Sequence, residues 1–170
     1  MKHRKPIFMI HKHHATHLHY DLRLEINGTL KSWALREIPL NPAKPILAIN
    51  VPDHPFWYRH FEGVIPEDHY GAGPVMVWEK GLYTIFTTDH EGKKMSLEEA
   101  YTQGLLLIWF EGKKLNGGYI LVRISKKQRW LLIKMPDEYV IKGRKPKHWN
   151  LSVKSGKTLE QVFETKKKQE

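Results

Sequence analysis

Apolar and charged side chains alternate strictly between residues 20 and 26, and this period of two indicates a β-strand. Successive side chains of a strand point to opposite faces, so one face of this segment enters a core and the other carries ionisable groups. The core-facing set is Tyr20, Leu22, Leu24 and Ile26, and the opposite face carries His19, Asp21, Arg23 and Glu25.

The dipeptide Asn27-Gly28 directly after this segment is the strongest short signal for a two-residue hairpin turn. It predicts a second strand at 29–35 and a definite register, because Ile26 must then pair with Thr29. Directly opposed residues share a face, so Arg36 is expected beside His19. The expected pairs are Leu24 with Lys31, Arg23 with Ser32, Leu22 with Trp33, Asp21 with Ala34, and His19 with Arg36.

Short strand-like segments separated by turn residues make up most of the remaining chain. This pattern predicts a mainly β fold, a compact closed or nearly closed β-barrel. Two short peripheral helices are predicted at capping boxes, one from Ser96 to a stop at Gly104 and one opening at Thr158. The further strands are expected at 46–51, 75–78, 82–87, 105–110, 119–124 and 130–135, with turns at 52–55, 71–74, 80–81 and 116–118.

Length and composition indicate one domain. The chain has 170 residues, 41% of them hydrophobic, which is sized for a single core over residues 1–170. Cysteine is absent, which excludes disulfides and thiolate metal ligands. No apolar stretch approaches the roughly 18 residues of a membrane span, and no signal-peptide core follows the basic N-terminus. We therefore expect a cytoplasmic protein without a membrane partner.

The formal net charge of +10 indicates a polyanionic partner, of which nucleic acid is the commonest in a cell. Part of this charge lies in basic ends, residues 1–6 and 165–170, which are expected to be solvated. The six tryptophans are expected in the core rather than as platforms for base stacking.

Residues of the first hairpin, with His13 and His54, form the candidate site. His13, His19 and Asp21 together can hold a divalent metal with positions open for substrate, provided that the segment between the histidines turns back. Arg23 can grip a phosphate with its guanidinium fork. His54 either donates a proton or hydrogen bond to a phosphate oxygen or satisfies the backbone of its predicted turn. Most other histidines are expected at the surface: His3, His11, His14, His17, His60, His90 and His148.

The sequence closely resembles the 3′-phosphoesterase family, a module at the N-terminus of bacterial ATP-dependent ligases for non-homologous end joining that also occurs as a free-standing protein, the form expected here. The resemblance covers nearly the whole chain, and the combined motif is highly specific. It rests on Lys12-His13, Leu18-His19-Tyr20-Asp21-Leu22-Arg23-Leu24-Glu25, Gly28-Thr29-Leu30-Lys31-Ser32-Trp33-Ala34, Asp53-His54-Pro55, Tyr58, Phe61-Glu62-Gly63, Val77-Trp78, Trp130-Leu131-Leu132-Ile133-Lys134 and Gly156-Lys157-Thr158-Leu159-Glu160.

The resemblance implies a compact β-barrel and an enzyme that depends on manganese or another divalent transition metal. Such enzymes remove a 3′-terminal ribonucleoside and then the 3′-phosphate, leaving a 3′-hydroxyl. The implied substrates are DNA or RNA 3′ ends on a primer-template, and the implied partners are a separate DNA ligase and end-joining proteins in a prokaryotic cytoplasm. The implied metal ligands are His13, His19 and Asp21, the implied catalytic or phosphate-binding residues are Arg23 and His54, and Tyr58 is an implied substrate contact.

Several positions depart from the family pattern. Glu37 stands where the family has a phosphate-binding lysine, Pro52 where it has a glutamate, and His11 where it commonly has a glutamine. Because the hairpin register places Arg36 on the site face, we predict that Arg36 binds phosphate in place of the lysine. Full phosphatase activity in an Arg36→Ala variant would exclude this role.

Two other functions fit parts of the pattern. His19 and Asp21 with a distant His54 also outline the iron site of a non-haem Fe(II) oxygenase, which leaves His13 unexplained. A non-catalytic basic β-barrel that binds nucleic acid would leave the convergent charges of the hairpin without a purpose. Manganese-dependent release of phosphate from a 3′-phosphate oligonucleotide separates the phosphoesterase from both.

Overall fold

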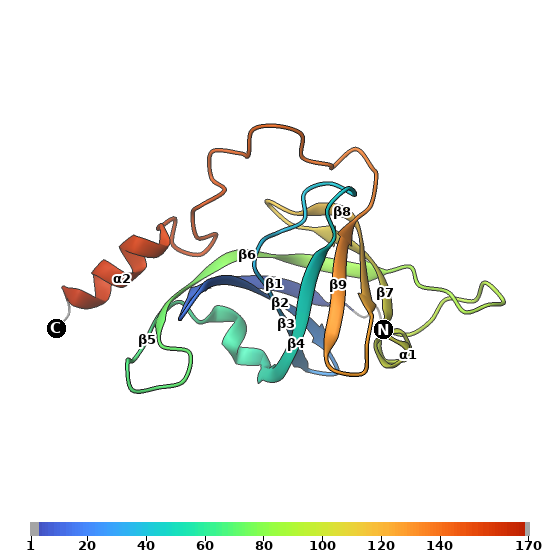
Figure 1. Ribbon diagram of the computed structural model, residues 1–170, viewed down its shortest axis with the longest axis horizontal. Coiled ribbons are helices and arrows are strands. Elements are labelled where there is room, and N and C mark those ends of the chain that lie inside the picture. The colour runs from blue at the N-terminus through green and yellow to red at the C-terminus, as the bar shows by residue number, and fades with distance from the viewer. Residues whose placement is uncertain (1–3, 169–170) are drawn as a thin grey trace.

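The computed structural model describes residues 4–168, in which eight antiparallel strands close into a barrel (Figure 1). Closure occurs because β6 pairs with β1 as well as with β7, and β5 is added to β6 outside the ring. The predicted mainly β barrel with two helices is confirmed. The elements are β1 (Ile7–His14), β2 (Leu18–Ile26), β3 (Thr29–Leu35), β4 (Ile46–Pro55), the 3₁₀ helix η1 (Phe56–His60), β5 (Gly63–Ile65), β6 (Gly73–Ile85), α1 (Leu97–Gln103), β7 (Leu105–Glu111), β8 (Asn116–Arg123), β9 (Arg129–Lys134) and α2 (Leu159–Lys167).

The β2–β3 hairpin has the predicted register, from the pair of Ile26 with Thr29 to the pair of Tyr20 with Leu35. Asn27 and Gly28 both have positive φ, 53° and 75°, as a type I′ turn requires. The prediction for Arg36 is wrong at one point: β3 ends at Leu35, and Arg36 lies in an exposed bend instead of pairing with His19.

The first strand, β1, was not among the predicted elements, and it completes the barrel. It pairs with β2 on one side and β6 on the other, and residues 15–17 turn the chain back between β1 and β2. The register places His11 opposite Asp21 and His13 opposite His19. Because opposed residues share a face, β1 adds two histidines to the charged face of β2.

Three of the predicted turns, at 52–55, 80–81 and 116–118, lie inside strands β4, β6 and β8. The glycines there mark close approaches. A Cβ on Gly81 would lie 2.2 Å from the Glu111 carbonyl oxygen of the neighbouring strand, and one on Gly117 would lie 2.7 Å from Asp137 Oδ2. Strand β4 continues to Pro55 because it still pairs with β3 there, so His54 lies on a strand rather than in a turn.

Both predicted helices are confirmed. The Ser96 side chain accepts a hydrogen bond from the Glu99 N–H at the start of α1, and Gly104 ends this helix with a φ of 82°. Thr158 and Gln161 form a complete capping box at α2, which lies beside β5 and β6 (Figure 1).

The basic ends are described only in part, because residues 1–3 and 169–170 lie outside the described residues. The Arg4 guanidinium donates hydrogen bonds to both carboxylate oxygens of Glu25, at 2.7 and 2.5 Å. At the other end, residues 165–167 belong to α2. No helix within residues 4–168 has the length and apolar character that a membrane crossing requires.

The tryptophans divide between the core and the surface. Four are buried: Trp33, Trp78, Trp130 and Trp149. The expectation of core positions is wrong for Trp109, which is 37% exposed, and for Trp57, which is 65% exposed.

Candidate functional site

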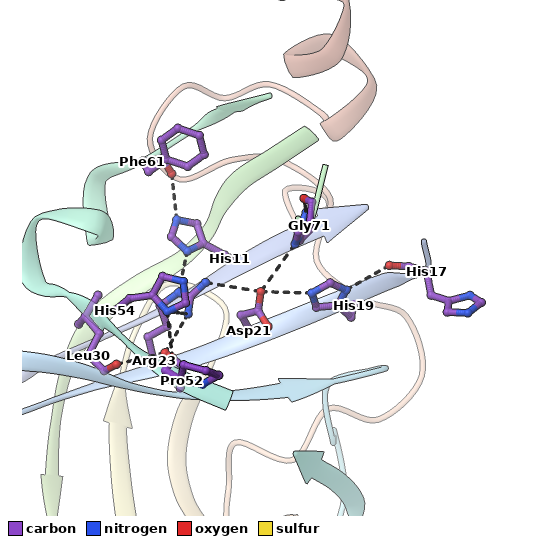
Figure 2. Close-up of polar contacts among 12 residues, drawn as sticks. His11, His17, His19, Asp21, Arg23, Leu30, Pro52, His54, Phe61 and Gly71 are labelled. Carbon is purple, nitrogen blue, oxygen red and sulfur yellow. Dashed lines mark hydrogen bonds and ion pairs between the residues drawn. The ribbon is translucent and has the colours of Figure 1, made fainter. Parts of the chain in front are cut away.

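His13, His19 and Asp21 converge at adjoining ends of β1 and β2. One ligand atom from each lies within 4.8 Å of the others. Asp21 Oδ2 is 3.2 Å from His19 Nε2 and 3.9 Å from His13 Nδ1. Figure 2 shows the Asp21 carboxylate between His19 and Arg23.

Each imidazole contacts a backbone carbonyl oxygen through the ring nitrogen that does not face Asp21. His13 Nε2 is 2.7 Å from the Gly71 oxygen, and His19 Nδ1 is 3.1 Å from the His17 oxygen. A carbonyl oxygen only accepts, so these two nitrogens carry the ring protons and donate them. His13 Nδ1 and His19 Nε2 face Asp21: His19 Nε2 shares a proton with the carboxylate, and both nitrogens would present lone pairs to a cation once that proton is released. The carbonyl contacts are the usual outer support of histidine metal ligands. The N, N, O donor set thus fits a divalent transition metal.

The charges around Asp21 favour its ionised form. Burial alone would raise the pKa of Asp21, but the hydrogen bond from His19 and the charge of Arg23 outweigh it and hold this pKa below its ordinary value. The same hydrogen bond raises the pKa of His19, whereas burial lowers the pKa of His13. A cation bound here would take the place of the proton that His19 shares with Asp21.

Arg23 lies beside this cluster and is almost completely buried. Its Nε donates to His11 Nδ1 at 2.9 Å, and its Nη1 donates to Ser32 Oγ at 2.8 Å. Its Nη2 is 3.5 Å from Asp21 Oδ2. Ser32 is the residue that the hairpin register placed opposite Arg23. The guanidinium is therefore held in one orientation, with its charge largely shielded from water.

His11 was expected at the surface, and this expectation is wrong because its side chain is fully buried. Since His11 Nδ1 accepts from Arg23, the ring proton is on Nε2, which lies 2.9 Å from the Phe61 carbonyl oxygen. Burial, followed by the charge of Arg23, lowers the pKa of His11 to about 3. His11 is thus a neutral support for Arg23. A sequence prediction that included strand β1 would have placed His11 at the site, because His11 and His13 are two residues apart and share a face of that strand.

The remaining surface expectations hold for the described residues. These side chains are exposed: His14, His17, His60, His90 and His148. His3 lies outside the described residues.

His54 and Tyr58 lie on the other side of Arg23. His54 Nδ1 is 3.1 Å from Arg23 Nη1 and also 3.1 Å from the Pro52 carbonyl oxygen. Arginine only donates and a carbonyl only accepts, so the contact with Arg23 requires an unprotonated Nδ1, with the ring proton on Nε2, whereas a hydrogen bond to Pro52 requires the proton on Nδ1. Burial, followed by the charge of Arg23, lowers the pKa of His54, which favours this neutral ring. The Tyr58 ring lies 4.8 Å from the His54 ring and 5.3 Å from Arg23 Cζ.

The structure brings six of the seven predicted site residues together and leaves one apart. Arg36 lies beyond the end of β3, so its predicted role no longer has the support of the hairpin register. Glu37 pairs with Lys44 at 2.6 Å. The adjoining six are His13, His19, Asp21, Arg23, His54 and Tyr58.

Residues 11–123 match the family described as the DNA Ligase D 3′-phosphoesterase domain. The multifunctional non-homologous end joining protein LigD of Pseudomonas aeruginosa is 43% identical over 134 residues, which are 76% of this chain and 15% of that protein. The protein of the same description from Mycolicibacterium smegmatis is 36% identical over 137 residues, 77% of this chain and 17% of that protein.

The multifunctional non-homologous end joining DNA repair protein LigD of Mycobacterium tuberculosis is 37% identical over 132 residues, 77% of this chain and 16% of that protein. The chain thus spans less than a fifth of the length of each of these three relatives. Its matching segment includes β2 to β8 and every one of the six adjoining site residues. The chain belongs to the DNA Ligase D 3′-phosphoesterase domain family.

Proposed function

We propose that this protein is a metal-dependent 3′-phosphoesterase that heals DNA or RNA 3′ ends by removing a terminal ribonucleoside and then the 3′-phosphate. The observation that carries the proposal is the three-ligand cluster of His13, His19 and Asp21 beside the buried guanidinium of Arg23. Family membership supports an end-processing role in non-homologous end joining. The net charge of +10 suits a nucleic-acid substrate.

His13 Nδ1, His19 Nε2 and Asp21 Oδ2 would hold the metal, for which we propose Mn²⁺ or another divalent transition metal. When bound, the ion would polarise a phosphoryl oxygen and offset the charge that develops in the transition state.

The protein's own groups would then act on the phosphate from the other side. Arg23 would attract and orient the phosphoryl oxygens with a charge that burial strengthens. His54 would donate its Nε2 proton to a phosphate or leaving-group oxygen while Nδ1 accepts from Arg23. Tyr58, packed on the His54 ring, would fix the orientation of that ring.

The oxygenase alternative receives no such support. The ligand cluster among residues 4–168 contains His13 rather than His54. His54 Nδ1 is 3.1 Å from a guanidinium nitrogen of Arg23, and this positive charge opposes cation binding at His54.

The test uses two primer-templates, one ending in a 3′-phosphate and one in a single ribonucleotide, each incubated with manganese or with EDTA. We expect conversion to a 3′-hydroxyl that requires manganese and is lost in Asp21→Asn. Asp53→Asn is the matched control, because Asp53 pairs with Lys31 on the surface next to His54 and should retain activity. Salt-sensitive binding without turnover under any metal would instead identify a non-catalytic nucleic-acid-binding barrel.

In the cell, we propose the prokaryotic cytoplasm as the location and a DNA ligase with end-joining proteins as the partners that use the healed end. This rests on the relatives, which are non-homologous end joining proteins.

A further inference from the structure

We propose that Trp57 and His60, on the exposed face of η1, form a platform on which a nucleobase near the 3′ end of the substrate strand stacks. The inference rests on the proposed function, since it places the base next to a phosphate held at Arg23. It concerns two residues that are not among the predicted site residues.

The geometry of a 3₁₀ helix gives η1 three distinct faces, because side chains at i and i+3 eclipse one another. Phe56 and Arg59 share one face, where the guanidinium carbon lies 3.8 Å from the ring centre. Tyr58 stacks on Phe61 at 5.1 Å with the two rings 10° from parallel, on the face beside the site. Trp57 and His60 share the third face, which is directed to solvent.

Trp57 is not used by the core. The residue is 65% exposed, and its ring contact is an edge contact of 5.7 Å with Tyr58, so much of the indole is accessible to a ligand. Exposed tryptophan is costly in water and suits stacking on a nucleobase, which every base permits because each has a π-face.

Short steps connect the platform to the phosphate site. The Trp57 ring is 5.7 Å from Tyr58, whose ring is 4.8 Å from His54. About three base steps of ~3.4 Å along a strand cover this span. A strand with its terminal phosphate at Arg23 would therefore bring one of its last few bases to Trp57.

The charge around the platform suits the backbone of such a strand. The charge of Arg59, followed by slight burial and the charges of Lys154 and Lys80, lowers the pKa of His60, which indicates that these basic groups lie around it. Lys154 also donates to the His60 carbonyl oxygen at 2.6 Å, which holds this basic group at η1. A basic surface with an exposed aromatic ring is the arrangement typical of single-strand binding.

The experiment is a double-mutant cycle between protein and substrate. It measures dissociation constants of 3′-phosphate oligonucleotides for the catalytically inactive Asp21→Asn protein and for the same protein with Trp57→Ala. An abasic residue is placed in turn at the last, second-last and third-last nucleotide. We expect Trp57→Ala to weaken binding of the intact strand about tenfold. For the one strand that lacks the base stacked on Trp57, Trp57→Ala should cause no further loss of affinity.

Two further variants complete the test. Trp57→Phe should retain part of the affinity, because it keeps a ring at this position. Trp109→Ala removes another partly exposed tryptophan, which contacts Tyr139, and should bind like the parent. Equal affinities for the parent and the Trp57→Ala protein, or equal effects of Trp57→Ala on all strands, would overturn the inference.

Failure of the proposed function is distinguishable from failure of this inference. Absence of metal-dependent phosphate release by the unmodified protein contradicts the phosphoesterase, whatever the cycle shows. Normal phosphate release without coupling between Trp57 and any base contradicts the platform alone.

Discussion

At the scale of single residues, Arg23 connects the groups of the site. Its guanidinium contacts Asp21, His11, Ser32 and His54, which come from strands β2, β1, β3 and β4. The contacts use different N–H directions of the planar guanidinium, so they depend on the shape of this group as well as on its positive charge.

Arg23→Lys is therefore not a conservative change. An ammonium group cannot reproduce the contacts of the fork, and we expect kcat on a 3′-phosphate oligonucleotide to fall by about 100-fold or more. Steady-state kinetics with saturating manganese measures this. Arg123→Lys, at an exposed arginine of β8, is the control and should keep full activity. A loss of less than threefold in Arg23→Lys would contradict a fork-dependent role.

His11 provides a prediction for the pH dependence of stability. Its folded pKa of about 3 lies below its ordinary 6.5, so the unfolded chain takes up a proton first as the pH falls. Stability is thus lost as the pH falls from 6.5 towards 3, with a slope of up to about 1.4 kcal/mol per pH unit.

His11→Gln keeps an acceptor for Arg23 and a donor for Phe61 but does not titrate. We expect the wild-type protein to lose more unfolding free energy than this variant between pH 6 and pH 4.5, as measured by urea unfolding. His11→Leu, which has neither group, should reduce activity at every pH. Parallel stability profiles for wild type and His11→Gln would show that His11 is not held neutral.

At the scale of elements, the length of β6 decides how the barrel closes. This strand passes through Lys80-Gly81 without a turn and pairs along its length with β5, then β1 and then β7. The passage depends on Gly81, where a Cβ would also lie 2.9 Å from Phe8 Cε1.

Gly81→Ala should therefore lower the unfolding free energy by about 2 kcal/mol, because the backbone of β7 must move to admit the methyl group. Urea unfolding of the purified variant measures the change. Gly63→Ala is the matched control in a strand, since a Cβ there meets only the Phe61 ring at an ordinary 3.7 Å. Identical unfolding midpoints for the Gly81 and Gly63 variants would contradict the close approach of β6 to β7 at Gly81.

At the scale of the whole molecule, the proposed metal binding should be coupled to folding, because the three proposed ligands come from two strands that only the barrel holds together. Manganese at 100 times its Kd should stabilise the folded protein by about 2.7 kcal/mol. For a chain of this length that raises Tm by roughly 5–10 °C.

EDTA should remove the whole increase in Tm, and Asp21→Asn should show none of it. Asp53→Asn should respond like the wild type. Thermal unfolding followed by circular dichroism measures each case. An equal response of Asp21→Asn and wild type to manganese would place the metal elsewhere.

Local patterns in the sequence predicted local structure well. The alternation at 20–26 and the positive φ that Asn27-Gly28 accepts are enough to set the β2–β3 register, because neighbouring residues alone determine them. The two capping boxes predicted both helices for the same reason. Predictions made from glycine alone failed at Gly81 and Gly117, because a glycine can serve a close approach as well as a turn.

Local sequence alone specifies the register of the β2–β3 hairpin and the strand face that its ionisable residues share. The burial of His11, the separation of Arg36 from the site and the exposure of Trp57 beside Tyr58 depend on the tertiary structure. These positions depend on β1, β4 and η1 meeting across the barrel, and such contacts between distant segments leave no period in the sequence. Alternation is a property of neighbours, whereas burial and charge at a site are properties of everything packed around it.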